Sequence, residues 1–403
     1  MFKLKLYLLF CFAFFYNYAQ VIKKDTLTND VKLENLPYYS FGKGIGLTSP
    51  DSIFQFNIRF RMQNRISYYE NEEASYDAQI RRLRLRFDGF VGNPKFLYVI
   101  QLSFAPGDVG VIEEGTDINI IRDAALIYRP NKNWNFVFGQ TKLPGNRQRI
   151  NSSGALQLTD RSINNARFNI DRDFGFHFNY NSLKYNQFSY SIKTAVSTGK
   201  GRNFSGRVNK SLALTGKLEI LPLGTFKNDG VFFEGDLAFE KKPKLMFSAA
   251  FSQNNHAEKT QGQLGNQLFE PKTLKSWFLE SVFKYKGFYS SFSFFSRNTT
   301  NNPLTYNDKN ELSYVFVGNG IDKQVSYIFN KKHEIICRYS YQKPIDKIQN
   351  LEPLINSFTI GYTKYIWEHS FKLQTEFTYN KLSFWDNQIK NNWYLRFQIE
   401  IGI

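Results

Sequence analysis

Charged and apolar residues alternate along several segments of this chain, most clearly in a run of three arginines. Arg82, Arg84 and Arg86 are interleaved with leucine and phenylalanine, and Arg59 and Arg61 repeat the arrangement upstream. Successive side chains of a β-strand point to opposite faces, so each segment has a guanidinium face and a hydrocarbon face. A soluble protein turns its charged face to water, whereas a membrane barrel has an apolar outer wall and a polar lumen. The choice between these two arrangements decides how the rest of the sequence is interpreted.

The composition favours the barrel. The chain has 403 residues, including 41 Phe and 24 Tyr, and 17% of its residues are aromatic. Its mean hydropathy is nevertheless only −0.43. That combination is typical of strands that are apolar on one face only. Beyond the N-terminus, no segment of the sequence is long and apolar enough for a membrane-spanning helix.

The N-terminus has the pattern of an export signal. Lys3 and Lys5 precede a short apolar core at residues 6–16, and Ala19 is a plausible residue before the cleavage site. An apolar core this short favours a signal peptide, residues 1–19, over a membrane anchor. We expect residues 20–52 to be a periplasmic lead-in and residues 53–403 to form a barrel in the bacterial outer membrane.

Period-2 segments recur at regular intervals and predict an all-β fold, a transmembrane antiparallel β-barrel. Short turns such as residues 92–94, 130–133 and 330–332 alternate with longer polar loops, as in outer-membrane barrels with short periplasmic turns and long extracellular loops. Residues 222–243 are interpreted as an elaborated periplasmic turn; if they form a wall hairpin, the barrel has 18 strands instead of 16. The 16 predicted strands are 53–66, 79–91, 95–105, 120–129, 134–142, 172–181, 186–198, 209–221, 244–253, 275–286, 287–297, 313–330, 333–343, 354–365, 368–380 and 391–403.

The arginines of the first two strands should lie close together on the inner face, because consecutive strands are antiparallel neighbours. Like charges opposite each other destabilise a sheet, but a water-filled lumen visited by anions tolerates them, and rings of Arg and Lys select anions in pores. The alternative is that Arg84 and its neighbours pair with lumen carboxylates such as Asp88, Glu234 or Glu280. The formal net charge of +17 also indicates anionic partners.

The longest uninterrupted connection, residues 143–171, is rich in basic residues. Loops of this length are often functional, and one this long can fold inward and narrow a channel; the alternative is a solvated extracellular loop. The predicted anion-binding, channel-lining residues are Arg59, Arg61, Arg82, Arg84 and Arg86 on strands, with Lys142, Arg147, Arg149 and Arg161 in or beside this loop.

Three motifs in this region resemble the signature of the phosphate-selective porin O and P family. They are FGQTKLP at 138–144, TDRS at 159–162 and RDFG at 172–175, and the strand RDAALIY at 122–128 fits as well. The overall character of the chain is similar to that of Bacteroidetes members of the family. The resemblance is sharpest between about residues 80 and 180. It implies a 16-stranded, typically trimeric outer-membrane porin with a basic channel, constricted by an inward-folded loop and serving small anions such as phosphate.

Other functions find less support in the sequence. The four histidines lack metal-ligand spacing, and no P-loop or dinucleotide-binding motif occurs, so we expect no metal, no cofactor and no enzyme activity. Binding to nucleic acid would explain the charge but not the export signal. Two alternatives stay open: a non-conducting structural or adhesive barrel in contact with outer-membrane lipid, and a general porin without anion selectivity.

Overall fold

The computed structural model of the protein describes residues 44–49, 51, 53–109, 120–208, 210–300 and 302–403. The chain divides into two units, residues 1–32 and 33–403. The first unit, and with it the predicted signal peptide, lies outside the described residues. All the elements below belong to the second unit.

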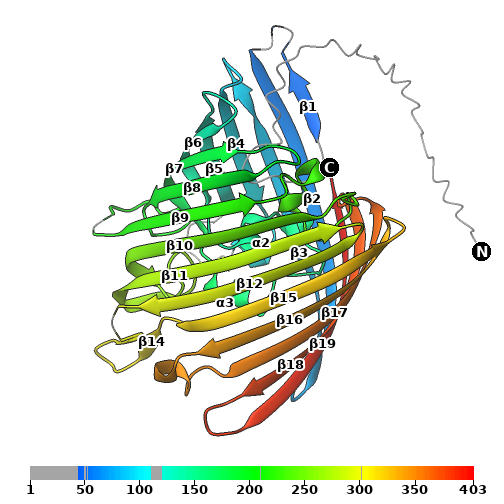
Figure 1. The fold of residues 1–403 in the computed structure, drawn as a ribbon. Helices are drawn as coiled ribbons and strands as arrows, with labels where there is room; N and C mark the ends of the chain where they lie inside the picture. The colour runs from blue at the N-terminus through cyan, green and yellow to red at the C-terminus, as the bar shows by residue number, and fades with distance from the viewer. Residues whose placement is uncertain (1–43, 50, 52, 110–119, 209, 301) are drawn as a thin grey trace, which may run out of the picture. The chain divides into compact units, whose positions relative to one another are not determined.

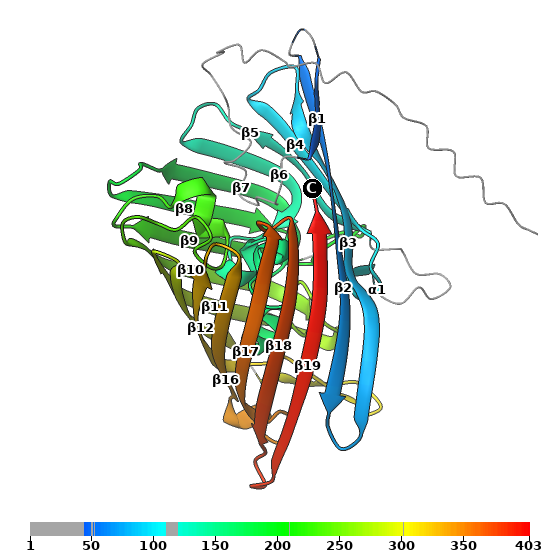
Figure 2. The same cartoon turned by 90° about the vertical axis from the view of Figure 1, so that its right-hand side faces the viewer.

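Sixteen antiparallel strands form a closed barrel, as the alternation predicts (Figures 1 and 2). Each strand pairs with the next along the chain, and β19 closes the barrel against β2, with Gly402 opposite Arg61. The wall strands are β2 (Phe54–Glu70), β3 (Ala74–Val91), β4 (Phe96–Ser103), β5 (Ile121–Tyr128), β6 (Trp134–Lys142), β7 (Arg172–Ser182), β8 (Ser189–Ser197), β9 (Leu212–Leu221), β10 (Lys244–Lys259), β11 (Gln267–Tyr285), β12 (Phe288–Thr299), β15 (Gly318–Phe329), β16 (His333–Pro344), β17 (Leu354–Trp367), β18 (Phe371–Ser383) and β19 (Ile389–Gly402).

The barrel is polar inside and apolar outside. Arg84 is 8% exposed and faces inward, whereas outward side chains such as Phe358 and Ile360 are 52% and 61% exposed. An apolar outer band is what a lipid bilayer requires of a strand-built wall. Among the described residues, no helix is both long and apolar enough to cross a membrane.

The two ends of the barrel differ, and we call them the turn end and the loop end. At the turn end, β11 and β12 meet at Lys286 and Gly287, both with positive φ (47° and 86°), as a tight two-residue hairpin requires. The connections of the loop end include residues 143–171, which contain α2 (Arg147–Ile150), η2 (Ser153–Ala155) and α3 (Ile163–Phe168). The remaining loop-end elements are α1 (Pro106–Val109), the hairpin of β13 (Leu304–Tyr306) and β14 (Leu312–Tyr314), and η4 (Asp346–Ile348).

Some predicted boundaries were wrong at the loop end. The expected loop 67–78 is a short turn at residues 71–73, because β2 and β3 continue beyond the apolar stripe. Much of the expected loop 254–274 likewise belongs to β10 and β11, whose pairing continues past a bulge near Ala257. Outside the apolar band a strand has no reason to alternate in hydrophobicity, so its polar extension resembles a loop in sequence.

Residues 222–243 do not add a hairpin to the wall. They contain η3 (Lys227–Phe232), and β9 pairs directly with β10 across their two ends. The barrel therefore has 16 strands and not 18. A further short strand, β1 (Ile45–Thr48), pairs with β2 at Gln55–Ile58, next to the point where β19 ends.

Candidate functional site in the barrel interior

The arginines of β2 and β3 lie close together on the inner face, as predicted, and some of them are directly opposite one another. The register pairs Arg59 with Arg86 and Arg61 with Arg84, and Gln63 lies opposite Arg82. All five arginines face inward, and each residue is no more than 9% exposed. Like charges opposite each other on neighbouring strands destabilise a sheet unless counter-charges or water offset them. The contacts of each guanidinium group therefore show how this column of arginines is stabilised.

Aspartates supply most of those counter-charges. Asp88 lies 2.9 Å from Arg59 and 3.0 Å from Arg86. Arg84 pairs instead with Asp108 of α1, which also holds Arg122 at 3.0 Å. Asp88 was one of the carboxylates predicted to pair with these arginines. It does pair with Arg59 and Arg86, the neighbours of Arg84.

The other two carboxylates considered, Glu234 and Glu280, serve different groups. Glu280 pairs with Lys217 at 3.1 Å, and Glu234 accepts a hydrogen bond from the Gln157 backbone N–H at 3.1 Å. Neither of them is the partner of Arg84, which pairs with Asp108 of a loop-end helix whose position no strand pattern indicates.

Asp160, in the connection 143–171, is held by three arginines of β2 and β3. Its carboxylate lies 2.8 Å from Arg81, 3.1 Å from Arg82 and 3.2 Å from Arg65. Burial would by itself raise the pKa of the Asp160 carboxyl, but the charges of Arg81, Arg82 and Arg65 outweigh it and hold that pKa well below its ordinary value. The carboxylate therefore stays ionised and ties the connection to this wall.

Two serines at the start of η2 add neutral contacts to the same wall. Arg61 donates to the hydroxyls of Ser152 at 2.9 Å and Ser153 at 2.7 Å, and Arg84 donates to Ser153 at 3.1 Å. Residues 152–160 thus rest on the arginine column. We call the inner faces of β2 and β3, with Asp160, Ser152 and Ser153, the charged contact.

The connection also contacts other parts of the wall. Lys372 of β18, close to β2 in the sheet, donates to the Leu156 carbonyl at 2.6 Å. Across the barrel, Lys217 of β9 donates to the Gly145 carbonyl at 2.8 Å. Arg297 of β12 donates to the Phe168 carbonyl at 2.7 Å. Residues 143–171 therefore lie inside the barrel and cross it, as the positions of α2 and α3 in Figure 1 also show.

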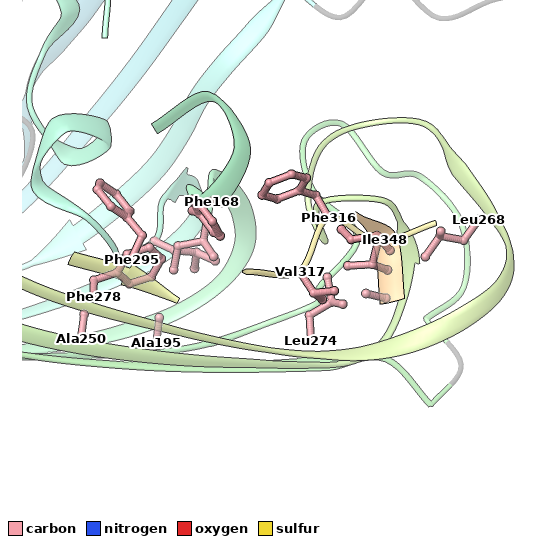
Figure 3. Close-up of a cluster of buried hydrophobic side chains, with 14 residues drawn as sticks. Phe168, Ala195, Ala250, Leu268, Leu274, Phe278, Phe295, Phe316, Val317 and Ile348 are labelled. Atoms are coloured by element: carbon pink, nitrogen blue, oxygen red, sulfur yellow. The ribbon is translucent and has the colours of Figure 1, made fainter. Parts of the chain in front are cut away.

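On the β8–β12 side the connection packs through apolar side chains (Figure 3). The Phe168 ring centroid lies 5.3 Å from that of Phe316 and 6.0 Å from that of Phe295. We call this cluster the apolar contact; its buried residues are Leu143, Phe168, Ile170, Ala195, Ala250, Ala257, Leu268, Leu274, Phe278, Phe295, Val315, Phe316, Val317 and Ile348.

A second group of charges surrounds the C-terminal end of the connection. Asp171 pairs with Arg149 and lies 3.5 Å from Arg172, and Asp123 lies 2.9 Å from Arg172. Burial by itself would raise the pKa of the Asp171 carboxyl. The positive charges of Arg149 and Arg172 outweigh the effect of burial, so this pKa lies below its ordinary value.

The predicted loop residues separate into different contacts. Lys142 donates to the carbonyls of Ile150 and Asn151, and Arg161 also donates to the Asn151 carbonyl, at 3.1 Å. Arg149 pairs with Asp171, as described above. Arg147 lies elsewhere, pairing with Glu219 of β9 at 3.1 Å.

Sequence reasoning overlooked Arg65, Arg81, Arg122 and Asp160 as members of this site. Arg65 continues the period-2 series of Arg59 and Arg61, so the signal was present in the sequence. Arg81 faces the same region as Arg82 because of a register shift at Gln63–Asn64, which no sequence pattern announces. Among the described residues, no cluster of three or more potential metal-ligating side chains occurs.

The closed 16-stranded barrel with a charged interior and an internal connection defines the class of outer-membrane porins. Solved porins have the same fold. The outer-membrane channel DcaP of Acinetobacter baumannii matches at a TM-score of 0.53 and 15% identity, covering 89% of this chain and 99% of that one. An anion-selective porin from Comamonas acidovorans matches at 0.53 and 9% identity over 87% and 100%. OmpF of Salmonella typhi matches at 0.56 and 11% identity over 89% and 100%.

The family follows from the sequence itself. The model of the family described as phosphate-selective porin O and P matches residues 54–319. The chain belongs to this family and is an outer-membrane channel protein. A comparison with curated protein sequences found no significant match.

Proposed function

We propose that the protein is a passive channel for small anions of the phosphate class. The observation that carries the proposal is the imbalance of charge at the charged contact and beside it. Five arginines (Arg65, Arg81, Arg82, Arg84 and Arg122) share two aspartates, Asp160 and Asp108. Such an excess of guanidinium charge favours anions, and the planar fork of arginine matches phosphate oxygens.

The same proposal gives the connection 143–171 the role of the constriction. It lies inside the barrel and contacts both walls, and its apolar contact occupies part of the β8–β12 side. Solutes would therefore pass along the arginine side, past Arg81 and Asp160, whose side chains keep 21% and 22% of their surface exposed. The comparison proteins include a trimer form of OmpT from Vibrio cholerae, which supports a homotrimer as the assembly.

Reversal potentials in a KCl gradient test the proposal directly. We expect the wild-type channel to favour chloride over potassium, and added phosphate to reduce the chloride current by competing for the arginines. Substituting Glu at Arg84 and Arg86 together should weaken or reverse the preference while the barrel still folds; the matched control is Lys309→Glu on an exposed loop-end hairpin. A cation preference in the wild type, or unchanged selectivity in the double variant, would contradict the proposal.

A second candidate is a barrel that does not conduct. One observation favours it: the inward arginines Arg59, Arg61 and Arg86 are between 5% and 9% exposed, so the interior is closely filled on this side. A folded protein that gives no conductance in planar bilayers would establish this second function.

A further inference from the structure

A cavity of about 370 Å³ lies at the turn end, separate from the charged contact. Its floor is the inner face of β6–β9, and its opposite wall is formed by residues 225–232 of the segment that contains η3. Lys132 and Lys184 stand at its solvent-exposed rim. The volume falls in the range of small-molecule sites.

The floor of the cavity is a set of amides placed by strand register. Asn135 of β6 lies opposite Asn179 of β7, which in turn lies opposite Lys193 of β8. Asn181, two residues further along β7, lies opposite Ser191. Since paired residues of neighbouring strands share a face, these side chains form one polar surface.

Asn179 lines the cavity, and the residue is 4% exposed. Among the described residues, none forms a hydrogen bond with its side-chain amide. By contrast, the Asn135 oxygen accepts a hydrogen bond from Arg129 Nε at 2.7 Å. The Asn181 oxygen accepts one from Ser191 at 2.6 Å, which leaves the Asn181 amide nitrogen available. Buried polar groups are nearly always paired, so an unpaired amide that lines a cavity points to a polar ligand.

The charged side chains at the floor are paired with one another. Lys193 Nζ lies 2.5 Å from the Glu219 carboxylate, which also pairs with Arg147 at 3.1 Å. The Phe232 ring faces this group, with Lys193 Nζ 5.9 Å from its centroid. The cavity therefore combines neutral donors and acceptors on one side with an aromatic face on the other.

We infer that this cavity binds a neutral, hydroxyl-rich ring compound, the chemistry of a small sugar. The Asn179 and Asn181 amides can donate to and accept from neighbouring hydroxyls, while the apolar face of the ring packs on Phe232. An inorganic anion would have to compete with the Glu219 carboxylate, which is already in contact with the buried ammonium of Lys193. This site goes beyond the proposed passage of anions and does not depend on it.

Titration calorimetry of the folded protein in detergent, with maltose as the probe, tests the inference. Asn179→Leu removes the unpaired amide at similar size; Asn391→Ala, at an exposed site on β19, is the control. We expect maltose to bind the wild type and the control alike, and Asn179→Leu about tenfold more weakly, since one or two hydrogen bonds are lost.

Three outcomes would overturn the inference: no maltose binding to the wild type, equal binding to Asn179→Leu, or binding of inorganic phosphate in place of maltose that Asn179→Leu abolishes. If Asn179→Leu fails to fold, Phe232→Ala replaces it, because Phe232 lies outside the wall strands; the same weakening is expected. The reversal potential in KCl, read on the same preparations, reports the proposed anion passage independently.

Discussion

The two sides of the connection 143–171 are held by different interactions, ion pairs on one side and apolar packing on the other. At the charged contact, three arginines of β2 and β3 hold one carboxylate. At the apolar contact, Phe168 is fully buried against Phe295 and Phe316. Charged contacts beside water depend on pH and salt, whereas apolar packing depends on neither to first order. We therefore infer that the apolar contact holds the connection under all conditions, whereas the charged contact, beside the arginines, changes in strength with pH and salt.

Phe168→Ala should have the largest effect, because it empties the centre of the apolar contact. Truncating a buried Phe costs about 3–5 kcal/mol, so the connection should loosen on the β8–β12 side while the strand pairing of the wall persists. Hydrogen exchange at residues 163–170 should rise and single-channel conductance should increase. Phe358→Ala on the outer face is the control, and conductance equal in the two variants would show that Phe168 does not hold the connection.

Asp160→Asn should have a smaller effect on the other side. Losing charge-assisted hydrogen bonds costs about 1.5–3 kcal/mol in local stability, and the three guanidinium groups lose their counter-charge. Exchange should increase at residues 152–160, and the preference for anions in reversal-potential measurements should strengthen. Asp308→Asn, on the loop-end hairpin, is the control. A weaker preference for anions would refute the proposed role of these arginines.

Acidification should weaken the charged contact alone, and by less than the substitution, because a protonated carboxyl keeps some of its hydrogen bonds. The Asp160 carboxyl has its pKa lowered in the folded protein. Its stabilising contribution is therefore complete above the ordinary aspartate pKa of about 3.9 and is lost as pH falls below that value towards the folded-state pKa.

Protection factors, which divide out the pH dependence of the intrinsic exchange rate, should consequently be constant at residues 152–160 from about pH 8 to 5 and should fall below about pH 4. Those of residues 163–170 should stay unchanged. A transition near neutral pH would assign the contact to another group, and Asp160→Asn should abolish the loss of protection at low pH.

The wall was predictable from the sequence because each strand has to alternate to meet lipid on one face and water on the other. The facing of Arg59 and Arg86 followed from that alternation and from the tight antiparallel pairing. The partners Asp108 and Asp160 were not predictable, because they lie in irregular segments whose path no periodicity records. The apolar contact was not predicted either. Phe168 lies in the irregular connection, and Phe316 was included in the predicted strand 313–330, whereas β15 begins only at Gly318.

The short strand β1 has a consequence for how the barrel is sealed. β19 stops opposite Arg61, which would leave the remaining N–H and C=O groups of β2 unpaired at the junction between first and last strands. Residues 45–48 occupy that place and hydrogen-bond to Gln55–Ile58. An exposed strand margin is a template for unwanted pairing with other chains. Residues that precede the first wall strand thus cover the edge of β2 at this junction. Deleting the residues before position 53 should therefore promote aggregation before it destabilises the barrel.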